Sequence, residues 1–277
     1  VWDKSFIGSL VAAYPITDLN NDNVTEFVID AWKGSLDTTD VFVISGIDGS
    51  LLWNTSIADH LAAAYPITDL NNDNVTEIAI NAINFEQPST IVEVRNGING
   101  SLLWSKTIDN SLSTIYPATD LTKDGVSELI VSSWLFSNQR LSEGKVEIID
   151  ASGTTLWNFS SYGMVAAYPA TDLTSDNVSE IIINVWSPEL DFTRVYVFEG
   201  FSRTELFNKT INGLAAAYPV SDLTGDNVSE VAINEIDLEE CTANITVFSI
   251  SVQKLKGDFN NNGRVDVGDV AYVAYMV

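Results

Sequence analysis

The sequence predicts an all-β fold, a five-bladed β-propeller of four-stranded blades, and three observations predict it. First, a phrase close to Ala-Ala-Tyr-Pro recurs about every 51 residues along the 277-residue chain. Its tyrosines are Tyr14, Tyr65, Tyr116, Tyr168 and Tyr218. Second, each repeat contains four short runs rich in β-branched residues, separated by Asn, Asp and Gly turns. Third, almost no segment has the 3.6-residue period of a helix. Four strands in a repeat of this length are typical of propeller blades.

The second repeat shows how the strands are assigned. Its four predicted strands are residues 61–68, 76–82, 89–95 and 101–108. Apolar and polar residues partly alternate in the run Glu77-Ile78-Ala79-Ile80-Asn81, as in a half-buried strand. The same division fits the other repeats. Residues 1–255 are therefore predicted to form the propeller, and residues 256–277 a separate C-terminal segment.

The spacing of aromatic residues predicts how the ring closes. The predicted fourth strands carry an aromatic residue 11 or 12 positions before the next repeat tyrosine: Trp53, Trp104, Trp157 and Phe207. Trp2 has the same spacing to Tyr14, so residues 1–7 are predicted to be a fourth strand. The last repeat has a third strand at residues 245–250 and no clear fourth. We expect the N-terminal strand to complete the last blade and hide the sheet edges. The alternative is that it completes a blade of a neighbouring molecule and so builds a polymer.

A nine-residue acidic loop follows each Tyr-Pro strand, at residues 18–26, 69–77, 120–128, 172–180 and 222–230. Oxygen-bearing side chains stand at positions 1, 3, 5 and 9, and position 7 is always Val, which offers only its carbonyl. Position 6 is Asn or Gly, the residues that tolerate the left-handed backbone of a sharp bend. Alternate inward side chains with one backbone carbonyl form the ligand pattern of a hard cation such as Ca²⁺.

The competing interpretation of these loops is an Asx-type hairpin turn that binds nothing. Such a turn explains one Asp and the Asn or Gly, but not three carboxylates held together five times. Those carboxylates repel one another unless a cation neutralises them, and an oxygen-only ligand set argues against zinc and copper. The predicted calcium ligands are Asp18, Asn20, Asp22, Val24, Glu26, Asp69, Asn71, Asp73, Val75, Glu77, Asp120, Thr122, Asp124, Val126, Glu128, Asp172, Thr174, Asp176, Val178, Glu180, Asp222, Thr224, Asp226, Val228 and Glu230.

These loops resemble the calcium loops of FG-GAP or integrin-type propeller repeats, whose pattern is Asp-x-Asp-x-Asp-Gly-x-x-Asp. The chain departs from that pattern at positions 3, 6 and 9, and Ala-Ala-Tyr-Pro replaces the Phe-Gly and Gly-Ala-Pro marks of the family. The segments Asp48-Gly-Ser-Leu-Leu-Trp53 and Asn99-Gly-Ser-Leu-Leu-Trp104 are also similar to a turn of quinoprotein-like propeller repeats. The resemblance spans residues 1–255 and implies a calcium-binding propeller; fold alone does not imply function.

The C-terminal segment carries a calcium loop of another kind. Oxygen ligands fall at positions 1, 3, 5, 7, 9 and 12 of an EF-hand-like loop, with Asp in place of the usual final Glu. They are Asp258, Asn260, Asn262, Arg264 (through its carbonyl), Asp266 and Asp269. A short apolar helix is predicted over residues 267–277. The pattern resembles one half of a dockerin module, which implies a protein partner, either a cohesin-like chain or a second copy. The other interpretation is a flexible acidic end.

Composition excludes several classes of partner. There are 13 Lys and Arg against 38 Asp and Glu, a formal net charge of −25. That field repels nucleic acid and anionic membrane surfaces, and no apolar stretch approaches the roughly 20 residues of a membrane span. Cys241 is the only cysteine and His60 the only histidine, which excludes internal disulfides, cysteine-pair zinc sites and His-based metal sites. We interpret His60 as an exposed turn residue.

The sequons indicate where the protein works. Five Asn-x-Ser/Thr sites lie outside the calcium loops and are candidates for glycosylation: Asn54, Asn99, Asn158, Asn208 and Asn244. Three of them directly follow a fourth-strand aromatic residue, an exposed place. Combined with calcium loops of the kind that extracellular modules use, they predict an exported protein at the cell surface.

The repeats argue against an enzyme, because catalysis needs unlike residues in one pocket and the five blades are near copies. Two non-enzymatic functions follow. The first is a calcium-stabilised scaffold, adhesion or surface-assembly protein that contacts other chains through its C-terminal segment. The alternative is a lectin-like propeller that binds glycans through Trp32, Trp134 and Trp186. The matching positions in the second and fifth repeats are Ile83 and Glu235 or Ile236, which breaks the repeat.

Overall fold

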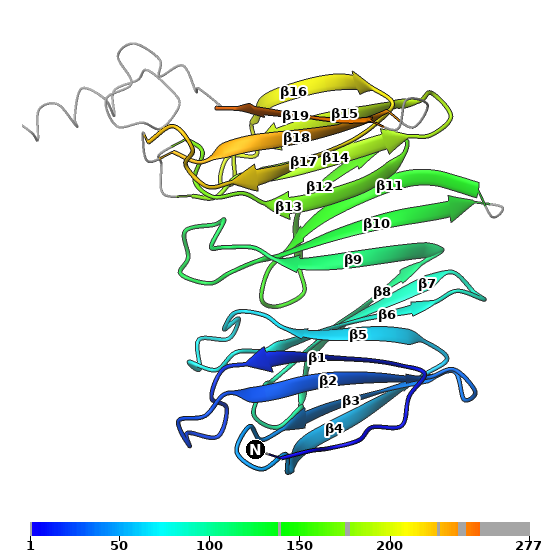
Figure 1. Cartoon of the computed structure of the whole chain (residues 1–277), viewed down its shortest axis with the longest axis vertical. Helices are drawn as coiled ribbons and strands as arrows, with labels where there is room; N and C mark the ends of the chain where they lie inside the picture. Colours follow the sequence, from blue (N-terminus) through cyan, green and yellow to red (C-terminus); the bar gives the residue numbers. More distant parts are fainter. Residues whose placement is uncertain (1, 138–139, 175–177, 226–227, 238–241, 250–277) are drawn as a thin grey trace, which may run out of the picture.

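The computed structural model describes residues 2–137, 140–174, 178–225, 228–237 and 242–249. Within these ranges the chain is all-β, with nineteen strands (Figure 1). None of the described segments is a helix long and apolar enough to cross a membrane. The predicted C-terminal calcium loop and helix, residues 256–277, lie outside the described residues.

The strands group into five consecutive antiparallel sheets, which we call blades one to five. Blades one and two consist of β1 (Leu10–Ile16), β2 (Glu26–Lys33), β3 (Thr38–Ile44), β4 (Leu51–Ala58), β5 (Leu61–Pro66), β6 (Ile78–Asn84), β7 (Ser89–Arg95) and β8 (Leu102–Asp109). Blades three to five consist of β9 (Ser111–Pro117), β10 (Leu129–Ser137), β11 (Arg140–Ile149), β12 (Thr155–Ser161), β13 (Met164–Pro169), β14 (Ile181–Ser187), β15 (Phe192–Phe198), β16 (Glu205–Asn212), β17 (Leu214–Val220), β18 (Glu230–Asp237) and β19 (Thr242–Phe248). The predicted strands of repeat two agree with β5 to β8 to within two residues at each boundary.

The pairing register repeats from blade to blade. In blade one, Tyr14 is opposite Val28, and Val28 is opposite Val43. In blade two, Tyr65 is opposite Ala79 in the same way. Because side chains alternate between the faces of a strand, an identical register places equivalent residues on the same face of every blade. Each blade therefore presents one apolar face to the blade before it and another to the blade after it.

The hydrophobic core lies between blades rather than within one central mass. We call the face toward the following blade the rear face and the face toward the preceding blade the front face. Between blades one and two, Leu19 and Val43 of the rear face join the same buried cluster as Ala64 and Ile80 of the next front face. Three further clusters join blades two to three, three to four and four to five. The fold is thus held together by four copies of one joint.

Polar side chains in the middle of the second strands also connect the blades. Asp30 accepts a hydrogen bond from the Ala64 amide at 3.1 Å. Asn184 makes two with the Ala217 backbone, donating to the carbonyl at 2.8 Å and accepting from the amide at 2.7 Å. Buried backbone groups must find partners, and these side chains provide partners for the first strand of the next blade.

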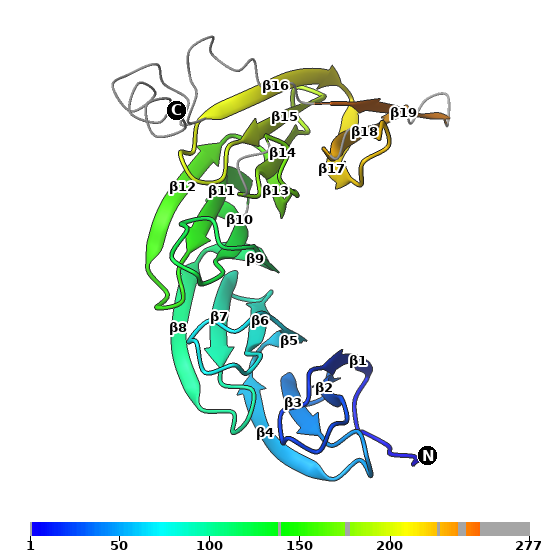
Figure 2. The same ribbon diagram turned by 90° about the vertical axis from the view of Figure 1, so that its left-hand side faces the viewer.

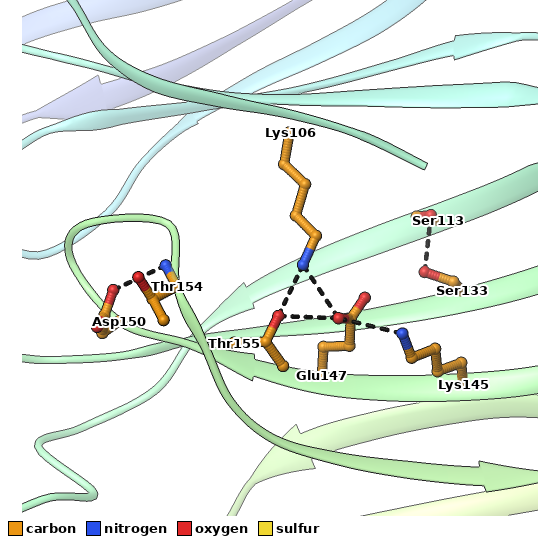
Figure 3. Close-up of polar contacts among 8 residues, drawn as sticks. All are labelled: Lys106, Ser113, Ser133, Lys145, Glu147, Asp150, Thr154 and Thr155. Carbon is orange, nitrogen blue, oxygen red and sulfur yellow. Dashed lines mark hydrogen bonds and ion pairs between the residues drawn. The ribbon is translucent and has the colours of Figure 1, made fainter. Parts of the chain in front are cut away.

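An ion pair adds a further contact between blades two and three (Figure 3). Lys106 of β8 reaches the buried Glu147 of β11 at 3.0 Å and the Thr155 hydroxyl at 2.7 Å. Burial opposes ionisation of Glu147, but the contacts with Lys106 and Thr155 outweigh it and lower its pKa. The pair therefore holds an outer strand against the following blade, as Lys209 and Glu235 do between blades four and five at 3.2 Å.

The prediction that the N-terminal strand closes the ring is wrong. The blades form an arc that is open on one side (Figure 2). Residues 2–8 form no strand and join no sheet; they lie against blade one, where the Trp2 indole donates to the Gly46 carbonyl at 2.8 Å. Blade five has three described strands, β17, β18 and β19. The physical reason is that the four joints do not turn the chain through a full circle, so Trp2 finds a local contact instead of β19.

Candidate metal centre

Each acidic loop leads from the first strand of a blade into its second strand. In blade one, the Asp18 carboxylate accepts the backbone N–H groups of Asn20 at 3.2 Å, Asp22 at 3.2 Å and Asn23 at 2.8 Å. Burial opposes ionisation of Asp18, but these N–H donors outweigh it and lower its pKa. The loop therefore winds around the carboxylate at position 1.

The loops have left-handed backbone at position 6, as the sequence predicts, and also at position 4. Position 6 has positive φ in the first three loops, at 64° for Asn23, 64° for Asn74 and 88° for Gly125. Position 4 is also left-handed, with φ of 61° at Asn21 and 63° at Lys123. Sequence reasoning missed position 4. Asn21 and Asn72 were the available signal, and Lys123 at the equivalent position obscured it.

The glutamate at position 9 is the buried member of each loop. Glu26 and Glu77 are fully buried at the end of the loop. The Leu19 amide donates to Glu26 at 2.6 Å, and the Leu70 amide donates to Glu77 at 2.6 Å. The second oxygen of Glu77 accepts from the Asn71 side chain at 2.9 Å. The glutamate thus ties both ends of the loop together.

Three carboxylates converge in each of the first three loops. Their oxygens lie within 4.8 Å of one another in three triplets: Asp18, Asp22 and Glu26; Asp69, Asp73 and Glu77; Asp120, Asp124 and Glu128. Burial, followed by repulsion from Asp73 and Asp69, raises the pKa of Glu77 to about 7. The same causes raise the pKa of Glu26 and Glu128. The loops therefore concentrate negative charge at sites that a metal ion fits.

The other predicted ligands are only partly placed. The side-chain oxygens of Asn20 and Asn71 accept the N–H groups of Asp22 at 3.0 Å and Asp73 at 2.9 Å, and the Thr122 hydroxyl donates to Glu128 at 3.0 Å. The Val24, Val75 and Val126 amides each donate to the position-5 Asp at 2.8 Å. The role of their carbonyls as ligands stays a prediction.

Loops four and five share the local contacts of the others. The Leu173 amide donates to Glu180, and the Leu223 amide donates to Glu230 at 2.7 Å. Asp172 and Asp222 each accept the N–H of the Thr two residues later, Thr174 at 3.1 Å and Thr224 at 3.0 Å. Asp176 and Asp226, the position-5 ligands, lie outside the described residues, so the triplets of these loops are not assembled here.

Sequence reasoning missed the leucine at position 2. Leu19, Leu70, Leu121 and Leu173 are 0–3% exposed and belong to the four clusters that join the blades. The same residue gives its amide to the position-9 glutamate. Each of these four acidic loops is therefore coupled directly to the joint with the next blade. The invariant Asp-Leu pair was the available signal.

Other candidate residues lie apart from these loops. The five sequon asparagines outside the loops, Asn54, Asn99, Asn158, Asn208 and Asn244, are all exposed. Trp32, Trp134 and Trp186 are half-buried, and the Trp134 indole donates to the Val165 carbonyl of blade four at 2.6 Å. His60 lies in the turn between β4 and β5 with its ring against the Ala58 carbonyl at 2.7 Å, and it is half-buried rather than exposed. The EF-hand-like ligands from Asp258 to Asp269 lie outside the described residues.

Comparison with known proteins finds likenesses among solved structures and not among sequences. No protein-family model and no curated protein sequence matches it. Among solved structures, it is similar to the Dos1 propeller, at 12% identity over 84% of this chain and 58% of that one, with a TM-score of 0.49. It is also similar to rhamnogalacturonan lyase YesW, at 9% identity over 88% of this chain and 63% of that one (TM-score 0.47). Acylaminoacyl peptidase of Pyrococcus horikoshii matches at 12% identity over 89% of this chain and 40% of that one (TM-score 0.46). The chain thus spans less than two thirds of the length of these proteins.

Proposed function

We propose that this chain is a non-enzymatic, calcium-stabilised scaffold that works outside the cell through contacts with other proteins. The observation that carries the proposal is the link between charge and packing in the acidic loops. Three carboxylates meet around a buried glutamate, and the leucine that donates to that glutamate packs into the joint with the next blade. A cation that neutralises the loop therefore stabilises the arc itself.

The ligand chemistry favours calcium over other metals. The triplets contain only oxygen donors, which suits hard cations and not zinc or copper. Calcium accepts six to eight oxygens in flexible geometry, whereas magnesium demands a tight octahedron. A loop that offers alternate side chains and a backbone carbonyl supplies the many flexible oxygens of a calcium site more readily than the tight octahedron of a magnesium site.

Near-identical loops favour a structural role over a catalytic one. Catalysis requires a nucleophile, an acid or base, and a charge-stabilising group that differ in kind and converge on one pocket. The first three loops instead repeat the same carboxylate triplet, each at the equivalent place in its blade. The exposed sequon asparagines and the dockerin-like segment agree with an exported protein that assembles with other chains.

Melting with and without calcium tests the proposal. A single site at 100 times its dissociation constant adds about 2.7 kcal/mol, so several sites should raise the melting temperature by many degrees relative to chelator. Glu77→Gln should remove part of that gain. Asp109→Asn is the matched control, because it removes one charge from an exposed strand end outside the loops. A melting curve that is the same in calcium and in chelator contradicts the proposal.

The C-terminal segment has its own test. Asp258→Ala with Asp269→Ala should remove calcium from that segment and abolish capture of a cohesin-like partner, while the calcium-dependent melting of the blades remains. The lectin alternative would use Trp32, Trp134 and Trp186, which are half-buried. A glycan array with Trp32→Ala as the control variant checks that alternative.

A further inference from the structure

We propose that the two ends of the arc bind each other between copies of this chain, so that molecules assemble head to tail. The rear face of blade five receives the front face of blade one, together with residues 2–8, of a second copy. This inference rests on the proposed scaffold function and deepens it by naming the partner and the surface. The joint would be a fifth copy of the four joints that already hold the blades together.

The rear face of blade five is apolar and exposed in the part of the chain that the structure describes. Its loop leucine, Leu223, is 62% exposed, whereas the equivalent leucines in the other four blades are 0–3% exposed. Ile245 and Val247 of β19 are 67% and 43% exposed, whereas Val41 and Val43 at the same register in β3 are fully buried. Contiguous exposed apolar residues of this kind mark an interaction surface.

The side chain of Asn234 in blade five has one buried atom without a hydrogen-bond partner in the described part of the chain. The side-chain oxygen of Asn234 is buried without a hydrogen-bond partner among the described residues. Asn184 occupies the same position in blade four, and its side chain makes both of its hydrogen bonds with Ala217 of the next blade. Within the described ranges, Asn81, inside the joint between blades two and three, also has an unpaired side-chain oxygen while its amide donates to the Ser113 carbonyl at 2.7 Å. The support for the joint therefore comes from the position of Asn234, which is the one that contacts the first strand of the following blade in blades two and four. In a second copy, the residue equivalent to Ala217 is Ala13.

The front face of blade one is the matching surface. Val11 is 44% exposed, whereas the equivalent residues Ala62, Val165 and Ala215 are 1–5% exposed. Ala13 is also exposed, whereas Ala217 is fully buried. These positions carry the same small apolar residue types as the front faces that are already packed inside the arc. The two ends therefore have the composition of two halves of one joint.

Residues 2–8 supply the fourth element that the described part of blade five does not contain. Trp2 contacts blade one in the way that Trp53 of β4 contacts blade two: the two indoles donate to Gly46 at 2.8 Å and Gly97 at 2.7 Å. A Cβ at Gly49 would meet the Trp2 ring at 2.9 Å, as one at Gly100 would meet Trp53 at 2.6 Å. The segment thus holds the place of a fourth strand in front of blade one.

Blade five of one copy and residues 2–8 of another would together make a blade of four elements. The outer edge of β19 has no ladder partner among the described strands, and unpaired sheet edges recruit other strands. The two end blades lie on either side of the opening of the arc (Figure 2), so the rear face of one copy can receive the front face of another without bending the four existing joints. Such a contact uses different surfaces on the two molecules and leaves one end of each free, so further copies can add to the dimer.

Sedimentation of the 277-residue chain in calcium, over a concentration series, tests the inference. The wild type should form oligomers that grow with concentration. A front-blocked variant, Val11→Glu with Ala13→Glu, and a rear-blocked variant, Ile245→Lys with Val247→Lys, should each stay monomeric at every concentration. Both should melt like the wild type at the lowest concentration, where the wild type is also monomeric, since all four positions are exposed. Their equimolar mixture should form a dimer and nothing larger, because each variant keeps one working end. The matched control, Leu102→Lys with Leu103→Lys on exposed positions of β8, should assemble like the wild type.

Three results would overturn the inference. The first is a wild type that stays monomeric at every concentration, whether the ring stays open or closes on itself. The second is a mixture of the two blocked variants that fails to form a dimer. The third is a rear-blocked chain that still assembles while a chain ending at residue 255 does not, which would place the contact in the C-terminal segment. In each case, calcium-dependent melting of the same samples reports separately on the proposed scaffold function.

Discussion

At the scale of single residues, position in the repeat decides what a side chain does. Leu121 and Leu223 occupy the same loop position, but one is fully buried in a joint and the other is 62% exposed at the end of the arc. The position-9 glutamates are buried among aspartates, which is a costly place for a carboxylate unless a cation or a proton neutralises it. A substitution in one blade can therefore be compared with the equivalent substitution in another blade, which serves as its control.

The loop leucines provide the first such pair. Leu121→Ala should lower the free energy of unfolding by about 2–5 kcal/mol, since it leaves a cavity in a packed joint. Leu223→Ala should change it by less than about 0.5 kcal/mol, as is usual for an exposed site. Urea unfolding of both variants in the rear-blocked background, which keeps the protein monomeric, measures the difference. Equal losses would contradict the role assigned to the leucine.

The raised pKa of Glu77 predicts an unusual pH dependence in chelator. Its folded-state pKa of about 7 lies above its ordinary value of 4.5, so the folded state binds the proton more tightly than the unfolded state. The resulting stability is fully present below pH 4.5 and is lost as the pH rises through about 7. Metal-free protein should therefore melt at a higher temperature at pH 5 than at pH 8.

Glu77→Gln separates this effect from the general repulsion of an acidic protein. The variant should lose its share of the gain on acidification, on the order of 2–3 kcal/mol at most, while Glu26 and Glu128 keep theirs. In calcium the gain should shrink or reverse, because protons compete with the metal for the same oxygens. A variant with the same pH profile as the wild type would show that Glu77 titrates normally.

At the scale of elements, each fourth strand is fixed to the next blade by its aromatic residue. Trp53 is 8% exposed and donates to the Gly97 carbonyl, whereas the indole nitrogen of Trp104 is buried without a partner among the described residues. Glycine is required opposite these rings, because a Cβ at Gly100 or Gly153 would meet them at 2.6 Å and 3.0 Å. The outer strands thus serve as clamps between blades.

A pair of matched substitutions measures the hydrogen bond of this clamp. Trp53→Phe and Trp104→Phe remove similar ring area, but only the first leaves a buried carbonyl without its donor. Trp53→Phe should therefore cost about 1–3 kcal/mol more in the free energy of unfolding than Trp104→Phe. If chemical denaturation gives equal losses for the two variants, the indole hydrogen bond contributes nothing to the joint.

At the scale of the whole molecule, the open arc and the charge of −25 act together. Repulsion between acidic blades favours opening of the joints. Bound calcium would reduce that repulsion at the loops that touch each joint. Six calcium ions, one for each predicted loop, would bring the net charge to about half of its value. Calcium should therefore make the arc both stiffer and more compact.

X-ray scattering from the rear-blocked variant tests this expectation on a monomer. The radius of gyration should be smaller in calcium than in chelator at the same ionic strength, and the difference should persist in about 0.15 M salt, where exposed charges are partly screened. Magnesium at the same concentration is the control for simple charge screening by a divalent ion. An unchanged radius of gyration in calcium would mean that the loops do not control the joints.

The sequence by itself determined the blades and their loops. The repeat of Ala-Ala-Tyr-Pro, the runs of β-branched residues and the Asn or Gly at position 6 predicted the strands of blade two and the left-handed backbone at Asn23, Asn74 and Gly125. These features are local, because strand alternation and turn conformation depend on neighbouring residues. The grouping of three carboxylates in each of the first three loops followed from the same local spacing.

Only the tertiary structure decided the shape of the molecule and the coupling of its loops. The angle between successive blades depends on how side chains such as Leu19 and Ala64 pack across a joint, and no periodicity in the sequence encodes that angle. An expectation of ring closure that rests on edge protection therefore failed, and Trp2 lies against blade one instead. The buried leucine at each loop, and the exposed Leu223 at the end of the arc, acquire their roles because burial depends on which blades are neighbours in space.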